Sequence, residues 1–156
     1  MKNEKKAYSA WSASLAAPLI KDFEGRKLVA YKCPAGIWTI GNGHTGAEVH
    51  EGLTITDAQA DEWLMSDILK VVRSLARYIN VQVTEGQFIA LTSLAFNIGV
   101  SKLVHDCPKL MRAVNACDVE LAAEEFLDIN RAGGVVLPGL VRRRKAESDL
   151  YLNDVS

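Results

Sequence analysis

Apolar residues near the start of the chain recur at helical spacing. Leu15, Leu19 and Phe23 lie at i, i+4 and i+8, which places them on one face of a helix. Pro18 suits only the first turn of such a helix, and the glycine that follows Glu24 is a natural helix terminator. The pattern therefore predicts a short helix that ends at Glu24.

The spacing changes over residues 28–46, where short strands are predicted. Residues 34–36, Pro-Ala-Gly, have the composition of a tight turn. Residues 37–40 are mostly β-branched or aromatic, which favours a strand, and three glycines then break the chain into loops. We expect a small β-sheet directly after the helix of Glu24.

Two capping-box signals mark the helices that follow. Thr56 precedes a glutamine by three residues, and apolar positions then keep helical spacing to about residue 79. Thr84 and Gln87 repeat the signal before residues 88–98, a nearly all-apolar helix expected at the centre of a second lobe. Shorter helical patterns cover residues 109–116, 120–131 and 141–152.

These elements predict an α+β fold in which helix dominates. We expect residues 1–156 to form a single domain with two lobes. An N-terminal lobe over about residues 14–55 holds the small β-sheet, residues 56–79 form a long connecting helix, and a helical lobe covers residues 83–153.

Charge and hydropathy narrow the choice of partners. The formal net charge of −1 gives no general attraction to nucleic acid or to an anionic membrane. The longest uncharged stretch, residues 7–20, is shorter than the roughly 20 apolar residues of a spanning helix, so no stable membrane insertion is expected. Lys2, Lys5 and Lys6 resemble the start of a signal peptide, which leaves an N-terminal export or anchor signal as an alternative.

The cysteines argue against a disulfide framework and against a zinc site. Cys33, Cys107 and Cys117 are an odd, sparse set without a CxxC pair. If Cys107 and Cys117 share a helix, they lie about 15 Å apart and cannot be bridged. Free thiols suit synthesis in a reducing cytosol.

Several motifs of this chain resemble those of one enzyme family. The chain is similar to phage-type lysozymes, glycoside hydrolase family 24, over roughly residues 15–152. The motifs occur in the family's order: Glu24-Gly25, Tyr31-Lys32, GIWTIGNGHT at residues 36–45, FNIG at 96–99, RAGG at 131–134 and LPGLVRRR at 137–144.

The resemblance implies a lysozyme-like fold with the active cleft between the lobes. It implies cleavage of the β-1,4 bond between N-acetylmuramic acid and N-acetylglucosamine, with Glu24 as the acid and Thr39 helping to position the attacking water. The best-known members carry Asp where this chain has Cys33. Cys33 could act as a base, as a nucleophile or as a small residue beside a water held by Thr39; a structural thiol is the alternative.

Five further residues are candidates for substrate binding: Trp38, His44, Phe96, Asn97 and Arg142. Each has a structural alternative. Trp38 suits sugar stacking or core packing equally, and the histidine that matches His44 in the family is a buried, structural one. Phe96 can be a core aromatic residue, and Asn97 either caps a helix or binds sugar amides.

The run Arg142-Arg143-Arg144-Lys145 is typical of a solvated helix face. A nucleic-acid-binding helix is an alternative interpretation. The resemblance implies instead that one of these arginines reaches Glu24, without identifying which.

The sequence thus predicts an endo-acting, inverting muramidase that lyses the bacterial wall at the end of a phage cycle. We expect no metal and no organic cofactor, peptidoglycan as substrate, no nucleic-acid partner, and a monomer. The expected setting is the host cytoplasm on synthesis and the periplasm after release. The alternatives are a non-catalytic peptidoglycan-binding protein, because of Cys33, and a lytic transglycosylase.

Overall fold

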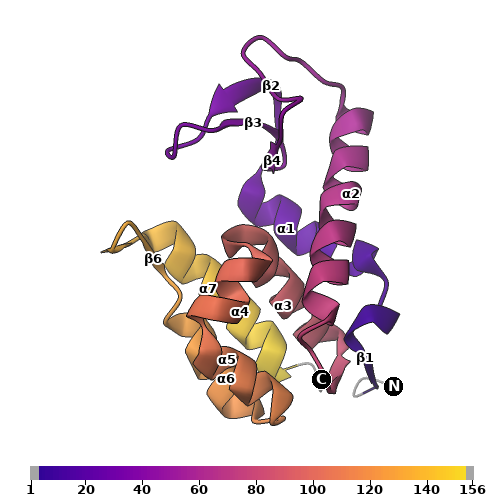
Figure 1. Cartoon of the computed structure of the whole chain (residues 1–156), viewed down its shortest axis with the longest axis vertical. Coiled ribbons are helices and arrows are strands. Elements are labelled where there is room, and N and C mark those ends of the chain that lie inside the picture. Colours follow the sequence, from indigo (N-terminus) through magenta and orange to yellow (C-terminus); the bar gives the residue numbers. More distant parts are fainter. Residues whose placement is uncertain (1–3, 154–156) are drawn as a thin grey trace.

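The long helix predicted from Thr56 joins the two parts of the molecule. In the computed structural model, which describes residues 4–153, it is α2 (Asp57–Ala76) and runs beside both the sheet and the helical lobe (Figure 1). Ala60 packs into a small core with Ile40 and Ile55, whereas Leu64 and the later apolar residues of α2 belong to the large core. One helix therefore contributes to both cores.

The predicted β region forms an antiparallel sheet of three strands, β2 (Lys27–Lys32), β3 (Trp38–Gly41) and β4 (His44–Thr45). Tyr31 pairs with Thr39 across β2 and β3. The turn between these strands is closed by the Gly36 amide, which donates to the Cys33 carbonyl at 2.8 Å, as the Pro-Ala-Gly composition predicts.

The helical lobe is arranged around α3 (Glu85–Ile98), which is buried along most of its length. Its capping box forms in full: the Gln87 amide donates to Thr84 Oγ1 at 3.2 Å, and the Thr84 amide donates to Gln87 Oε1 at 3.0 Å. The surrounding helices are α4 (Val100–Asp106), α5 (Pro108–Asn115), α6 (Val119–Leu127) and α7 (Pro138–Asn153).

The N-terminal segment is part of this lobe. Strand β1 (Lys5–Ala7) pairs with β5 (Gln82–Thr84), and two short 3₁₀ turns, η1 (Tyr8–Ala10) and η2 (Ala13–Ala16), lead into α1 (Ala17–Glu24). The buried Tyr8 hydroxyl lies 2.6 Å from Thr92 Oγ1. Lys2, one of the lysines on which the alternative of an export or anchor signal rested, lies outside the described residues.

Among residues 4–153, no single helix has the length and apolarity of a membrane span. In that range, only α3 and α4 taken together have the length and apolarity of a span, and the chain bends by 100° between these two helices.

The prediction of one helix over residues 120–131 was wrong at its C-terminal end. Helix α6 ends at Leu127, and the chain then forms a hairpin of β6 (Arg131–Ala132) and β7 (Val135–Val136). Gly133 and Gly134 both have positive φ, 57° and 80°, as a two-residue type I′ turn requires. The turn chemistry of this glycine pair therefore outweighs the helical pattern before it.

Candidate active site

Glu24 lies where the sequence predicts, at the last position of α1. Gly25 ends the helix with a positive φ of 69°. The Glu24 side chain is 19% exposed, and its Oε2 lies 2.5 Å from Nη1 of Arg143 on α7. Its Oε1 lies against Gly43, where an added Cβ would come within 2.9 Å of that oxygen. Arg143 therefore fixes one carboxylate oxygen, and the other lies close to Gly43, in the turn between β3 and β4.

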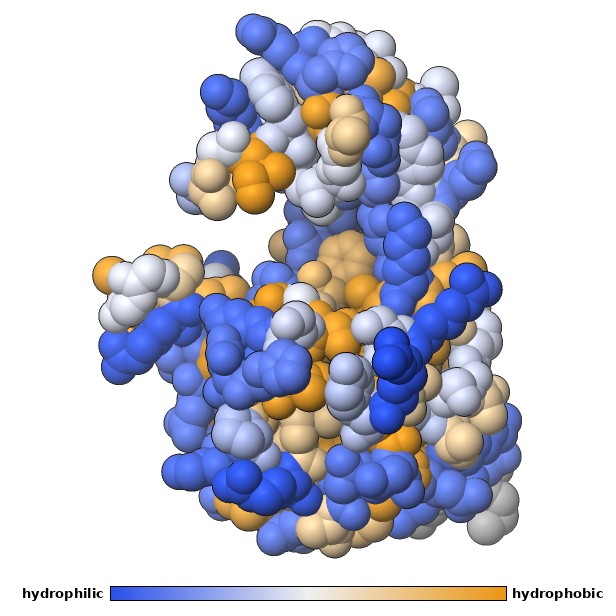
Figure 2. Space-filling view, in the orientation of Figure 1, coloured by the Kyte–Doolittle hydropathy of each residue, from blue (hydrophilic) through white to orange (hydrophobic). Residues whose placement is uncertain are grey.

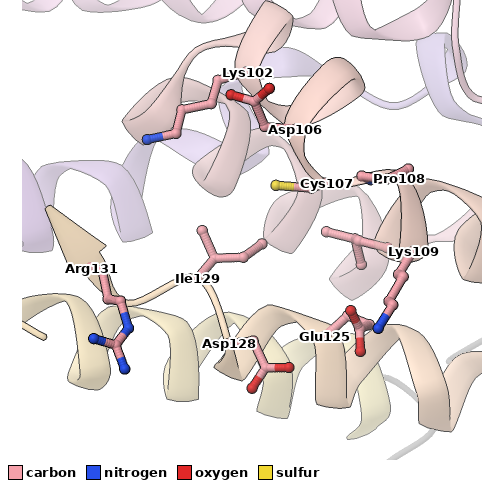
Figure 3. Close-up of a pocket in the computed structure, with 10 residues that line it drawn as sticks. Lys102, Asp106, Cys107, Pro108, Lys109, Glu125, Asp128, Ile129 and Arg131 are labelled. Carbon is pink, nitrogen blue, oxygen red and sulfur yellow. The ribbon is translucent and has the colours of Figure 1, made fainter. Parts of the chain in front are cut away.

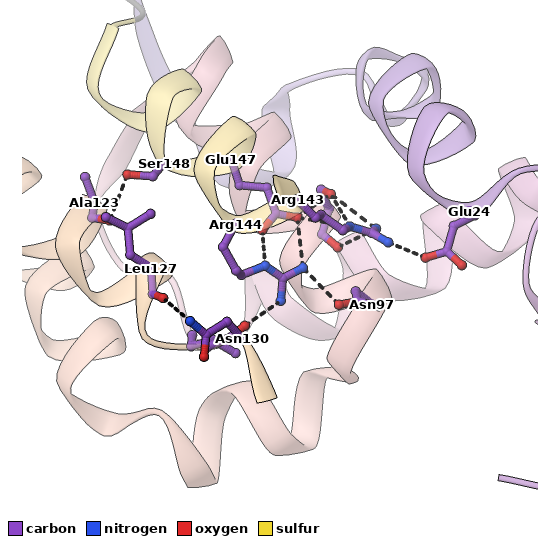
Figure 4. A network of polar contacts seen from close by, with 11 residues as sticks. Glu24, Asn97, Ala123, Leu127, Asn130, Arg143, Arg144, Glu147 and Ser148 are labelled. Atoms are coloured by element: carbon purple, nitrogen blue, oxygen red, sulfur yellow. Dashed lines mark hydrogen bonds and ion pairs between the residues drawn. The ribbon is translucent and has the colours of Figure 1, made fainter. Parts of the chain in front are cut away.

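Arg143 belongs to a buried polar network that links α7 to α3 (Figure 4). Its Nη2 donates to the Ser93 carbonyl at 3.1 Å, and its Nε lies 3.3 Å from Glu147 Oε2. Arg144 Nε forms an ion pair with Glu147 Oε1 at 2.7 Å, and Arg144 Nη2 donates to Asn97 Oδ1 at 2.9 Å. Burial raises the pKa of Glu147 and lowers that of Arg144, while their mutual attraction opposes both shifts.

The arginine run is therefore not a solvated helix face along its whole length, and Arg143 is the arginine that reaches Glu24, as the resemblance implied for one of them. Arg143 is 4% exposed and Arg144 is fully buried, whereas Arg142 and Lys145 are exposed. Two of the four cations, Arg143 and Arg144, are buried and paired with the buried Glu147, so the run does not present the continuous basic surface that a nucleic-acid-binding helix needs.

Cys33, Thr39 and Tyr31 lie together at the end of the sheet. Thr39 is buried, and its hydroxyl donates to the Ile37 carbonyl at 2.9 Å. The partly exposed Cys33 thiol has a lowered pKa, chiefly because the Ile37 backbone amide faces the sulfur. Partial burial opposes this shift, while the Ala35 amide and the Thr39 side chain support it. The thiolate needed for a base or a nucleophile is thus favoured.

Tyr31 connects this group to Glu24. Its pKa is raised, first by burial and then by the negative charges of Glu24 and Cys33. The tyrosine ring therefore lies within electrostatic range of both candidate catalytic residues. The sequence motif contained Tyr31, yet only the sheet register shows that it is paired with Thr39.

A pocket of about 510 Å³ opens beside Glu24. It lies between α1, the end of α3 and the start of α7, and Figure 2 shows the surface deeply hollowed between the sheet lobe and the helical lobe. Asp22, the Leu137–Leu140 region and Asn97 contribute to its wall. Arg142, one of the predicted substrate-binding residues, lines it together with Arg143.

The other predicted binding residues have different surroundings. Asn97 lines the pocket while its Oδ1 accepts from Arg144. Phe96 packs against the large core and lies near Gly43 and Glu24. Trp38 is half-buried against the sheet-lobe core, with Lys32 Nζ 5.4 Å from its ring centroid.

His44 has both ring nitrogens occupied by carboxylates. Nδ1 lies 2.7 Å from Asp67 Oδ2, Nε2 lies 2.6 Å from Glu48 Oε2, and the ring packs 4.5 Å from that of Trp63. Burial alone would lower the pKa of His44, but the two carboxylates outweigh it and raise the pKa. No ring nitrogen is left for a sugar, so the geometry favours the structural role of His44 over substrate binding.

A second pocket, of about 400 Å³, lies in the helical lobe (Figure 3). Cys107 and Ile129 form its floor, with charged side chains of both signs around them. It contains none of the predicted catalytic residues. Arg144 contacts one lining residue of each of these two pockets: its Nη1 lies 3.5 Å from the Ile129 carbonyl, and its Nη2 donates to Asn97 Oδ1.

Among residues 4–153, no group of three or more His, Cys, Asp and Glu side chains could hold a metal ion. The three cysteines are free: Cys107 precedes α5, and Cys117 follows it at a positive φ of 57°.

A carboxylic acid at the end of the first helix, facing a cleft between a small sheet and a helical lobe, defines a lysozyme-type fold and site. The chain belongs to the phage lysozyme family, whose model matches residues 21–147.

The chain is similar to curated phage endolysins. It is 39% identical over 140 residues to the endolysin of Bacillus phage B103, an alignment that covers 88% of this chain and 52% of that protein. It is 39% identical over 137 residues to the endolysin of Acyrthosiphon pisum secondary endosymbiont phage 1 (85% and 92% covered). A SAR-endolysin of Enterobacteria phage P21 is 33% identical over 129 residues (83% and 77% covered). The chain thus spans about half of the first relative and most of the other two.

Solved structures agree with this assignment. The endolysin from Escherichia coli O157:H7 phage FAHEc1 has a TM-score of 0.80 and 35% identity, covering 89% of this chain and 91% of that one. The muramidase domain of SpmX from Asticaccaulis excentricus has a TM-score of 0.81 and 34% identity, covering 96% and 99%. The predicted α+β, mostly helical lysozyme-like fold is confirmed.

Proposed function

We propose that this chain is an endo-acting muramidase that hydrolyses the β-1,4 bond between N-acetylmuramic acid and N-acetylglucosamine in peptidoglycan. The observation that carries the proposal is Glu24, fixed at the end of α1 beside an open pocket and in electrostatic range of the Tyr31 and Cys33 group. Membership of the phage lysozyme family supports the substrate class.

Glu24 is the general acid. Glycoside hydrolysis needs a protonated carboxylic acid to donate a proton to the leaving oxygen while the anomeric carbon develops oxocarbenium character. Arg143 holds Glu24 Oε2 but is itself also paired with Glu147. Glu24 is therefore one of two carboxylate partners of Arg143, and the contact with Glu147 within α7 does not depend on Glu24.

Thr39 and Cys33 act on the water side. In the inverting course, water attacks the face opposite the leaving group, and a base accepts its proton. Thr39 positions this water, and the Cys33 thiolate, favoured by its lowered pKa, accepts the proton. A nucleophilic Cys33 would instead give two displacements and retention of configuration.

We further propose that Arg142 and Asn97 contact the glycan, since both line the pocket beside Glu24. Trp38 and Phe96 are weaker candidates, because each packs against a core. The enzyme works as a monomer without nucleic acid, and it acts at the periplasmic cell wall after synthesis in the host cytoplasm. The similarity to a SAR-endolysin supports export to that compartment.

Release of reducing ends from purified peptidoglycan tests the proposal. Under reducing buffer, wild type should cleave, and Glu24→Gln, which cannot donate the proton, should be inactive. Cys33→Ala should lose at least about tenfold, roughly 1.4 kcal/mol of barrier. Binding of the wall by wild type without release of reducing ends would instead support the non-catalytic alternative.

A further inference from the structure

A second polar cluster lies on the sheet-lobe side of Glu24 and is separate from the Arg143 network. Asn42 forms the turn between β3 and β4 and is only 4% exposed. Its Nδ2 donates to the Gly25 carbonyl. Its Oδ1 accepts from Arg26, at 3.1 Å from Nε and 2.9 Å from Nη2. The amide thus joins the turn to the two residues that follow Glu24.

The guanidinium of Arg26 extends this connection to α2. Nη1 lies 3.3 Å from Asp57 Oδ1 and 3.4 Å from the Asp57 carbonyl, and Nη2 contacts Asp61 Oδ1. The planar fork of arginine can engage two groups on different elements at fixed angles. Arg26 therefore holds together the end of α1, the β3–β4 turn and the first turns of α2.

This cluster reaches Glu24 through Gly43. Gly43 follows Asn42, and its Cα faces Glu24 Oε1 so closely that a Cβ would lie within 2.9 Å. A shift of the β3–β4 turn would therefore move Gly43 relative to Glu24 Oε1. The other carboxylate oxygen, Oε2, is paired with Arg143 on α7. The orientation of Glu24 depends on both sides.

We propose that Arg26 and Asn42 form a brace that positions Glu24 for proton transfer. They are positioning residues, because neither touches the carboxyl group itself. The inference rests on the proposed role of Glu24 as the acid. An acid displaced by a fraction of an ångström still binds the glycan beside it, but it meets the glycosidic oxygen less often at reacting distance.

Steady-state kinetics on soluble glycan strands, at a temperature where circular dichroism shows each variant folded, tests the brace. Asn42→Leu and Arg26→Leu should each lower kcat about tenfold while KM stays within about twofold. The kcat of the double variant should be no more than about twofold below that of the less active single variant, because the two residues act as one unit. If Asn42→Leu does not fold, Arg26→Leu and Arg26→Lys supply the test.

Lys21→Met is the matched control. The Lys21 ammonium group forms the other ion pair with Asp61, at 3.2 Å. Lys21 meets Gly25 only through its backbone carbonyl, which accepts from the Gly25 amide at 3.0 Å and is retained in Lys21→Met. Its kcat should equal that of wild type. Arg26→Lys should remain well below wild type, since an ammonium group cannot engage Asn42 and Asp57 as a fork.

Three results would overturn the brace: wild-type kcat in Asn42→Leu or Arg26→Leu, full recovery in Arg26→Lys, or an equal loss in Lys21→Met. Glu24→Gln distinguishes a failure of the brace from a failure of the proposed role of Glu24 as the acid. If it is inactive while the brace variants keep their kcat, only the brace fails. If Glu24→Gln keeps wild-type activity, the acid assignment fails and the brace fails with it.

Discussion

Arg143 Nη1 and Glu24 Oε2 lie 2.5 Å apart, although 119 positions separate the two residues in sequence. This ion pair joins α1 to α7 in the wall of the pocket beside Glu24. It also resolves the question that the sequence left open, namely which arginine of the run reaches the acid.

Removal of Arg143 should therefore lower the stability of the fold. Arg143→Met leaves Glu24 and the buried Glu147 with one cation fewer, which we expect to cost about 3–5 kcal/mol of unfolding free energy. Urea unfolding measures this loss. Arg142→Met is the control for stability, because exposed Arg142 on the same helix should change it by less than about 0.5 kcal/mol. Equal losses in both variants would contradict a specific role for the buried pair.

The two ion pairs of His44, with Asp67 and with Glu48, predict a pH range in which they stabilise the fold. The pKa of His44 is raised, so its contribution is fully present below its unfolded pKa of about 6.5 and is lost as pH rises through the folded value. The pKa of Glu48 is lowered, chiefly by His44, so its contribution is present above about 4.3 and is lost as pH falls. Both contributions are in force between these limits.

Unfolding free energies from pH 4 to pH 9 would check this window. Wild type should lose stability above about pH 6.5, and His44→Gln should show a flatter curve over the same range. His50→Gln is the control, because the ring of exposed His50 lies against the Glu51 backbone carbonyl, at 2.9 Å from Nδ1, and forms no ion pair with a carboxylate of residues 4–153. A slope in His44→Gln as steep as that of wild type would rule out His44 as its source.

Cys33 should be the thiol whose modification stops the enzyme. Its lowered pKa and partial exposure favour rapid reaction with a methanethiosulfonate reagent. We expect inactivation of wild type and of Cys117→Ala at the same rate, with activity restored by dithiothreitol. Any residual activity of Cys33→Ala should resist the reagent. If Cys117→Ala instead keeps its activity in the reagent, the thiol whose modification stops the enzyme is Cys117 and not Cys33.

Gly43 and Gly52 provide a matched pair of glycine substitutions. Both have positive φ, 81° and 84°, so alanine at either position costs about 1–3 kcal/mol of backbone strain. Only at Gly43 would the new Cβ press on Glu24, because nothing lies within 4 Å of such a Cβ at Gly52. Gly43→Ala should lose at least about tenfold in kcat, while Gly52→Ala, if folded, keeps it. Equal kcat in both variants would refute the close approach.

The local elements could be predicted from the sequence because their signals are local. Leu19 and Phe23 lie in α1 as predicted, whereas Leu15 lies before it, in the 3₁₀ turn η2. The capping box of Thr84 marks the start of α3 through nearby atoms, and the family motifs identified Glu24. By contrast, the burial of Arg144 depends on α3 and α6, which pack around α7.

A signal for part of that network was present in the sequence. Glu147 follows Arg143 by four positions and Arg144 by three, a spacing that permits ion pairs on one helix face. The same spacing also suits an exposed face, so it could not distinguish the two outcomes. The Arg26–Asn42 contact had no local signal, since 16 positions and a sheet turn separate the two residues.

The central claim is hydrolysis of the glycan strand, and digestion of purified peptidoglycan in H₂¹⁸O followed by mass spectrometry tests it most directly. A muramidase of the proposed kind puts one ¹⁸O atom at the new reducing end of N-acetylmuramic acid, and Glu24→Gln yields no such product. Anhydro products without ¹⁸O would identify a lytic transglycosylase, and the absence of any soluble fragment from wild type would contradict the enzyme assignment itself.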